Sequence, residues 1–160
     1  MADDLTVIQG TREEQYEGLL QQITGLVTGE SDLIANLANV SAALKLQFGW
    51  LWVGFYLVNK YELVLGPFQG PIACTRIPFH KGVCGACYTQ RKTIIVPDVD
   101  QFPGHIACSS ASKSEVVVPV FNRNGTVAMV LDVDSDQLDD FTQADAEGLE
   151  KIVKLLEGKI

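Results

Sequence analysis

The hydrophobic positions at the start of the chain follow the spacing of two amphipathic helices. Over residues 12–27 the apolar side chains recur three, four and seven positions apart: Tyr16, Leu19, Leu20, Ile23, Leu26 and Val27. A second helix is predicted after Gly29, where Ser31 and Asp32 provide N-cap side chains. Its expected buried stripe consists of Ile34, Leu37, Ala38, Ser41, Leu44 and Phe48. Two helices therefore precede any strand.

After residue 49 the pattern changes to short runs of branched and aromatic residues, which is typical of strands. Two of these runs flank Asn59-Lys60 and predict a hairpin. The runs are at 50–58, 62–68, 75–79, 93–96, 115–121 and 126–134. Thr142 and Asp145 then resemble a capping box that begins a C-terminal helix. Helices at both ends of a mostly antiparallel sheet of about six strands predict an α+β fold.

Length and charge limit the class of protein further. A chain of 160 residues with 47% hydrophobic residues predicts a single domain, 1–160, with an N-terminal helical segment at 1–30. A net charge of −8 opposes binding to nucleic acid or to anionic membranes. The first four residues include two acids and no basic stretch, and no apolar run is long enough to cross a bilayer. We therefore expect a cytoplasmic protein.

All four cysteines lie in the least regular region, residues 67–114, together with both histidines: Cys74, Cys84, Cys87 and Cys108. Long irregular connections inside a compact domain often carry function. The cysteines have three interpretations, as buried apolar thiols, as metal ligands or as a redox relay.

The metal interpretation is the weakest of the three. Cys84 and Cys87 have C-x-x-C spacing, and His80, His105, Cys74 or Cys108 would have to complete a zinc site. A structural zinc site normally uses two short ligand pairs, and no second pair is present. A thioredoxin-like C-x-x-C would follow the first strand of a βαβ unit, whereas this one follows several strands. No metal and no cofactor are predicted.

Three acidic residues are more informative. Asp132 and Asp134 are two apart, so a strand through them points both side chains to one face. If the strands at 115–121 and 126–134 pair across the turn at 122–125, Glu115 and Asp134 lie at matching ends, and three carboxylates come together. Such a cluster needs a cation or a shared proton. The alternative, in which the strand simply leaves the protein at Asp132, stays equally open.

Six motifs, in order, resemble one family. They are WVGFY at 52–56, LGPFQGPIAC at 65–74, GVCG at 82–85, GHIAC at 104–108, SE at 114–115 and LDVDS at 131–135. Together they closely resemble the free methionine-(R)-sulfoxide reductases, which are single GAF domains. The likeness extends from about residue 31 to the C-terminus.

The resemblance implies a GAF-domain fold and a role for each motif residue. It implies that Cys108 is the nucleophile and that Cys74 and Cys84 are partners in disulfide formation, with Cys74 the first choice as resolving thiol. It implies substrate-pocket roles for Trp52, Tyr56, Glu115, Asp132 and Asp134. Cys87 matches no family cysteine. The family is usually dimeric, and thioredoxin is the expected reductant.

The chemistry of these residues agrees with that resemblance. A cysteine attacks the sulfoxide sulfur, an acid protonates the departing oxygen, and a second thiol resolves the sulfenic acid. Carboxylates bind the ammonium group of a free amino acid, and an indole such as Trp52 covers the methyl group. Trp52 and Tyr56 also suit plain core packing. The competing class is a GAF sensor that binds a small ligand without turnover.

Overall fold

The computed structural model describes residues 4–160. Residues 1–3, which are part of the acidic N-terminus noted in the sequence, lie outside the described residues. Within this range the chain forms four α-helices, one short 3₁₀ helix and six strands. The elements are α1 (Arg12–Val27), α2 (Leu33–Phe48), β1 (Trp52–Val58), β2 (Glu62–Gln69), β3 (Arg76–Pro78), α3 (Gly82–Gln90), β4 (Ile94–Val96), η1 (Val99–Gln101), β5 (Ser114–Phe121), β6 (Val127–Ser135) and α4 (Gln143–Glu157).

The strands form one sheet in the order β3-β2-β1-β6-β5-β4, and every neighbouring pair is antiparallel. The predicted hairpin joins β1 to β2, and the turn after β5 joins it to β6. At the C-terminal helix, the backbone amide of Thr142 donates to the Asp145 carboxylate at 2.9 Å, as expected for a capping box. The predicted α+β fold is confirmed.

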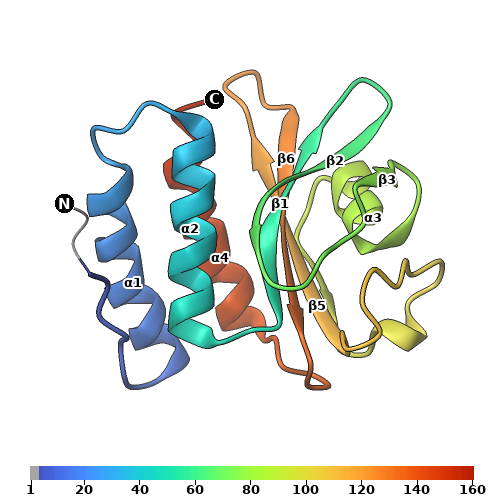
Figure 1. Cartoon of the computed structure of the whole chain (residues 1–160), viewed down its shortest axis with the longest axis horizontal. Helices are drawn as coiled ribbons and strands as arrows, with labels where there is room; N and C mark the ends of the chain where they lie inside the picture. Colours follow the sequence, from blue (N-terminus) through green and yellow to red (C-terminus); the bar gives the residue numbers. More distant parts are fainter. Residues whose placement is uncertain (1–3) are drawn as a thin grey trace.

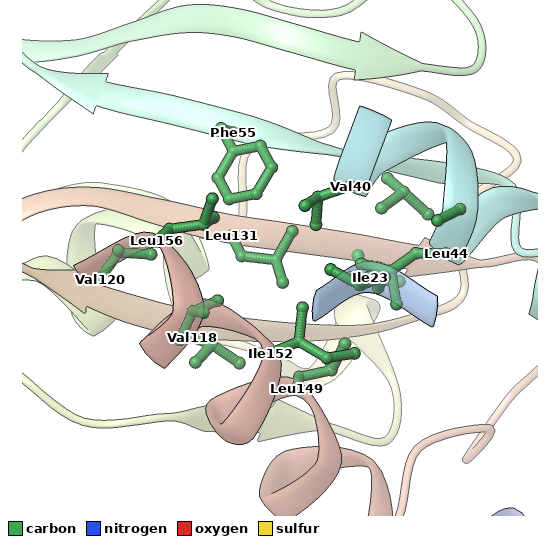
Figure 2. Packing of buried hydrophobic residues seen from close by; sticks show 14 of the residues in the cluster. Ile23, Val40, Leu44, Phe55, Val118, Val120, Leu131, Leu149, Ile152 and Leu156 are labelled. Carbon is green, nitrogen blue, oxygen red and sulfur yellow. The ribbon is translucent and has the colours of Figure 1, made fainter. Parts of the chain in front are cut away.

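Helices α2 and α4 cover one face of the sheet, and α1 packs against these two helices on the side away from the strands (Figure 1). The side chains of each strand alternate between the two faces, and the set facing these helices is apolar. From β5 and β6 this set includes Val116, Val118, Val120, Met129, Leu131 and Val133. Figure 2 shows Leu131, Val118 and Val120 beside Leu149, Ile152 and Leu156 of α4. This is the larger hydrophobic core.

The predicted buried stripe of α2 is partly wrong. Ile34 is 54% exposed, and Ala38 is exposed as well. The buried side lies further round the helix, at Asn36, Leu37, Val40, Ser41, Ala43, Leu44 and Gln47. The physical reason is that α2 packs against α1, β1 and β2 together. Apolar spacing alone does not say which of two adjacent stripes meets those neighbours.

The opposite face of the sheet carries a second, smaller cluster, covered by α3 and the connections around it (Figure 1). Trp52 and Tyr56 of β1 point to this face, as do Val117 of β5 and Val130 of β6. Cys84 and Cys87 of α3 pack against them. The cysteine-rich region thus covers the sheet face that the three long helices leave free.

None of the helices within residues 4–160 has both the length and the apolar character required to span a membrane.

Candidate functional site

A pocket of about 580 Å³, counted with its opening to solvent, lies on the α3 side of the sheet. Strand residues form its floor, and α3 and the loops before and after it form its walls. Seven of the eight site residues predicted from the sequence line it: Trp52, Tyr56, Cys84, Cys108, Glu115, Asp132 and Asp134. The eighth, Cys74, is bonded to Cys108.

The strand register gathers the three carboxylates. Glu115 of β5 pairs directly with Asp134 of β6, and Asp134 also pairs with Trp52 of β1. Asp132 lies two residues along β6 on the same face and pairs with Gly54. The predicted pairing of Glu115 with Asp134 is confirmed. Asp132 is only 6% exposed, which rules out the alternative that the strand leaves the protein at this residue.

Burial makes it costly for all three acids to carry a charge. It raises the pKa of Glu115, which the negative charges of Asp132 and Asp134 raise further. Burial also raises the pKa of Asp134, and it raises that of Asp132 to about 6. Hydrogen bonds from Glu115 and Cys84 oppose the rise at Asp132. Because the three acids interact and the pKa of each is raised, the cluster titrates as one group.

Two further residues contact the acids. The hydroxyl of Ser112 donates to Asp134 Oδ1 at 2.6 Å, and His105 Nε2 lies 3.7 Å from Glu115 Oε2. Burial lowers the pKa of His105. No sequence pattern singles out Ser112, because it lies in a loop of small polar residues. His105 belongs to the GHIAC motif, so the sequence marks it as a residue near the site. The motif does not predict that its partner is a carboxylate.

Asp132 Oδ1 stands apart from the other pocket oxygens. It is buried and has no hydrogen-bond partner among residues 4–160. No lysine or arginine of the described residues lines the pocket. A buried charged oxygen without a hydrogen-bond partner is unfavourable. A cationic ligand that donates a hydrogen bond to this atom would therefore be bound favourably.

Aromatic side chains form the wall beside the acids. The Trp52 ring stacks on Phe68 and on Tyr56, with centroids 5.2 and 5.8 Å away, and its Nε1 donates to the Pro71 carbonyl at 3.1 Å. Gly54 makes this close packing possible, since a Cβ there would lie 2.3 Å from the Phe68 Cβ. Trp52 and Tyr56 are nearly fully buried and also line the pocket, so they serve both core and site.

A disulfide joins Cys74 and Cys108 across 34 residues of sequence, with Cα atoms 5.4 Å apart. Cys74 follows β2, and Cys108 lies in the loop between η1 and β5. The Tyr56 hydroxyl donates to the Cys74 carbonyl at 2.9 Å and so ties this loop to β1. The bond lies beside the acid-lined pocket, because Cys108 is one of the lining residues.

Among the described residues, Cys84 and Cys87 are free thiols buried on α3. Burial raises the pKa of both. Cys84 lines the pocket, whereas Cys87 lies one turn further along the helix and does not. Within residues 4–160 the zinc site considered from the sequence is not assembled, because Cys74 and Cys108 are bonded to each other and neither histidine joins Cys84 and Cys87 in a group of potential ligands. In the described part of the chain, the group of potential metal ligands that does form consists of Cys84, Glu115 and Asp132.

Residues 28–157 match the family model described as GAF domain. The fold and the site together define a GAF domain whose pocket combines buried acids with a cysteine pair.

Comparison with similar proteins shows to which family of GAF-domain proteins the chain belongs. GAF domain-containing protein A from Dictyostelium discoideum is 61% identical over 98% of this chain and 99% of its own length. Free methionine-R-sulfoxide reductase from Saccharomyces cerevisiae is 42% identical over 91% of this chain and 85% of its own. The X-ray structure of free methionine-R-sulfoxide reductase from Neisseria meningitidis in complex with its substrate is 50% identical, with a TM-score of 0.94, over 98% of this chain and 94% of that one. The chain belongs to the free methionine-R-sulfoxide reductase family.

Proposed function

We propose that this protein reduces free L-methionine (R)-S-oxide to L-methionine, with Cys108 as nucleophile. The observation that carries the proposal is the Cys74–Cys108 disulfide beside a pocket of buried acids and stacked aromatic rings. Relatives named for this activity at 42% and 50% identity support it. Preference for the R epimer rests on those relatives.

The reaction begins with attack of the Cys108 sulfur on the sulfoxide sulfur. An acid protonates the oxygen, the oxygen is transferred to Cys108 as a sulfenic acid, and methionine is released. The Cys74 thiol then attacks the sulfenic sulfur, which forms the disulfide and releases water. The two thiols together supply two electrons to the sulfoxide. Thioredoxin restores them by thiol–disulfide exchange.

The three carboxyl groups have two different roles, proton donation to the sulfoxide oxygen and binding of the substrate ammonium group. Glu115 or Asp134 polarises or protonates the sulfoxide oxygen, because burial raises the pKa of both and so favours their proton-bearing forms. Asp132 binds the substrate ammonium, and its unpartnered Oδ1 is a ready acceptor for that group. The ammonium also offsets the negative charge that otherwise opposes ionisation of Cys108. Trp52 and Tyr56 cover the methyl end of the substrate.

Cys74 is the first resolving thiol and Cys84 the second. The short Cα separation of Cys74 and Cys108 supports this order, and so does the burial of Cys84 on α3. The enzyme is proposed to act in the cytoplasm as a homodimer, in line with the resemblance of its motifs to the family.

Substrate scope follows from the ammonium site. A peptide bond or an N-acetyl group removes the cation and leaves the buried Oδ1 of Asp132 without a partner, which costs binding energy. Peptide-bound methionine sulfoxide should therefore be a poor substrate.

Oxidation of NADPH in the presence of thioredoxin, thioredoxin reductase and free methionine sulfoxide tests the proposal. Turnover is expected with the free R epimer, with chromatography showing the S epimer left over and little rate on N-acetylmethionine sulfoxide. A GAF sensor would consume no NADPH under these conditions. Equal rates on free and blocked substrates would overturn the ammonium site while leaving the reductase chemistry intact.

A further inference from the structure

Three potential metal ligands meet in the pocket from three different elements. Cys84 lies on α3, Glu115 on β5 and Asp132 on β6, and one ligand atom of each lies within 4.8 Å of the other two. All three side chains are buried. In a tetrahedral zinc site, thiolate and carboxylate ligands are roughly 3.4–3.8 Å apart, as metal–ligand distances of about 2.0–2.3 Å require. A side-chain adjustment of about 1 Å closes the site around an ion.

A second observation points to a ligand at the same place. Asp132 Oδ1 is buried and has no hydrogen-bond partner within residues 4–160. No described lysine or arginine lines the pocket to balance its charge. An ammonium group satisfies the carboxylates but gains little from a sulfur donor. A thiol beside two carboxyl groups suits a borderline divalent cation such as Zn²⁺, which displaces the protons of its ligands when it binds.

We propose that, when no substrate is bound, this pocket binds one Zn²⁺-class cation through Cys84, Glu115 and Asp132. The ion is an inhibitor of the site and not a cofactor, because it uses Asp132, the same carboxylate that binds the substrate ammonium. That competition rests on the proposed function, whereas the cation site itself does not.

This site differs from the C-x-x-C site considered from the sequence. Cys87 lies deeper in the second hydrophobic cluster and is not among the three ligands. Asp134 is hydrogen-bonded to Ser112 and is not part of the set. The site also survives oxidation of the Cys74–Cys108 pair, since Cys84 remains a free thiol in the disulfide form.

Titration of the disulfide form with Co²⁺ tests the proposal. One equivalent should give the strong visible absorption of tetrahedral cobalt and a near-ultraviolet thiolate-to-cobalt band. Cys84→Ala should remove that band, and the matched variant Cys87→Ala should keep it. Asp132→Asn should weaken Co²⁺ binding at least about tenfold, while Asp136→Asn, at an exposed acid next to β6, should leave it unchanged.

Measurements on the unaltered chain keep the proposal testable if a variant fails to fold. Zn²⁺ and free methionine should each displace Co²⁺ and abolish both absorptions. Absence of a thiolate band, or its persistence in Cys84→Ala, overturns the site. A spectrum that methionine does not change overturns the competition. A protein without reductase turnover that still gives the Cys84-dependent band refutes the proposed function and leaves the cation site standing.

Discussion

The two faces of the sheet differ in what their side chains do: one face forms the hydrophobic core, and the other forms the acidic pocket. On the face covered by α2 and α4, consecutive inward positions of β6 are Met129, Leu131 and Val133, all apolar. On the other face the alternate positions are Val130, Asp132 and Asp134, where a hydrophobic residue leads into two acids. One residue along the strand therefore separates core packing from the chemistry of the pocket.

The difference shows where each face gains and loses free energy. The helix-covered face is a continuous apolar core, and its burial stabilises the fold. The pocket face holds carboxylates whose burial raises their pKa values and, where they are charged, destabilises the fold. Substitutions on the first face should change stability, and substitutions on the second should change reactivity and binding.

The largest expected effect comes from the pocket side, at Cys108. Cys108→Ser should lower turnover at least about a thousandfold, because a serine hydroxyl is not a competent nucleophile toward sulfur at neutral pH. In reductant, where the disulfide is absent in both proteins, the free energy of unfolding should change by less than about 0.5 kcal/mol. The NADPH assay and urea unfolding measure the two quantities. Residual activity within tenfold of the unaltered protein would remove Cys108 from its role.

Adjacent residues on opposite faces give the sharpest contrast. Leu131→Ala should destabilise the reduced protein by about 2–5 kcal/mol, because it opens a cavity in a fully buried core. Asp132→Asn should leave stability unchanged or raise it, because it removes a buried charge, yet it should weaken methionine binding at least about tenfold. Urea unfolding and calorimetry measure these effects. Similar losses of stability in both variants would contradict the division between the faces.

The acids also predict how stability depends on pH. Burial raises their pKa values in the folded protein, that of Asp132 to about 6, so the folded state binds more protons than the unfolded state above pH 4. Stability should therefore fall as pH rises from about 4 through 6, and Glu115 and Asp134 extend the fall to higher pH. Asp132→Asn should remove a part of this fall on the order of 3 kcal/mol.

The matched control for this pH dependence is Asp136→Asn, which changes an exposed acid close to Asp132 in sequence. It should retain the full pH dependence, measured by urea unfolding at several pH values in the reduced state. A stability that rises between pH 4 and 6 in the unaltered protein would mean that the pocket acids are stabilised as charged groups.

The sequence predicts the fold and the meeting of the acids because both depend on period and pairing. If β5 and β6 pair across the turn between them, alternation places Glu115 opposite Asp134, and the structure has this pair. The sequence pattern leaves open whether Asp132 is buried, which the structure decides. The stripe of α2 is less predictable, because two neighbouring stripes are both apolar enough to be buried. Ile34 and Ala38 are exposed since the packing of α2 on three neighbours decides the orientation.

Sequence patterns do not predict which residues the loops contact. Ser112 and His105 reach Asp134 and Glu115 only because the loop before β5 folds back over the sheet. Only the family resemblance predicts the pairing of Cys74 with Cys108. The two residues are 34 positions apart, with loops and a helix between them, so the sequence pattern itself does not constrain their distance. Periodicity predicts regular elements, whereas irregular connections need tertiary contacts.

The smallest effect on activity is expected for substitution of Cys87, which tests whether every cysteine near the pocket takes part in the reaction. Cys87 is fully buried in the second cluster but does not line the pocket, and burial raises its pKa, so it reacts poorly. Cys87→Ala should leave the rate of NADPH oxidation within about twofold of the unaltered protein. It should reduce the free energy of unfolding by about 1 kcal/mol through the lost sulfur contacts. A large loss of cycling with methionine release intact would instead make Cys84 and Cys87 a working redox pair.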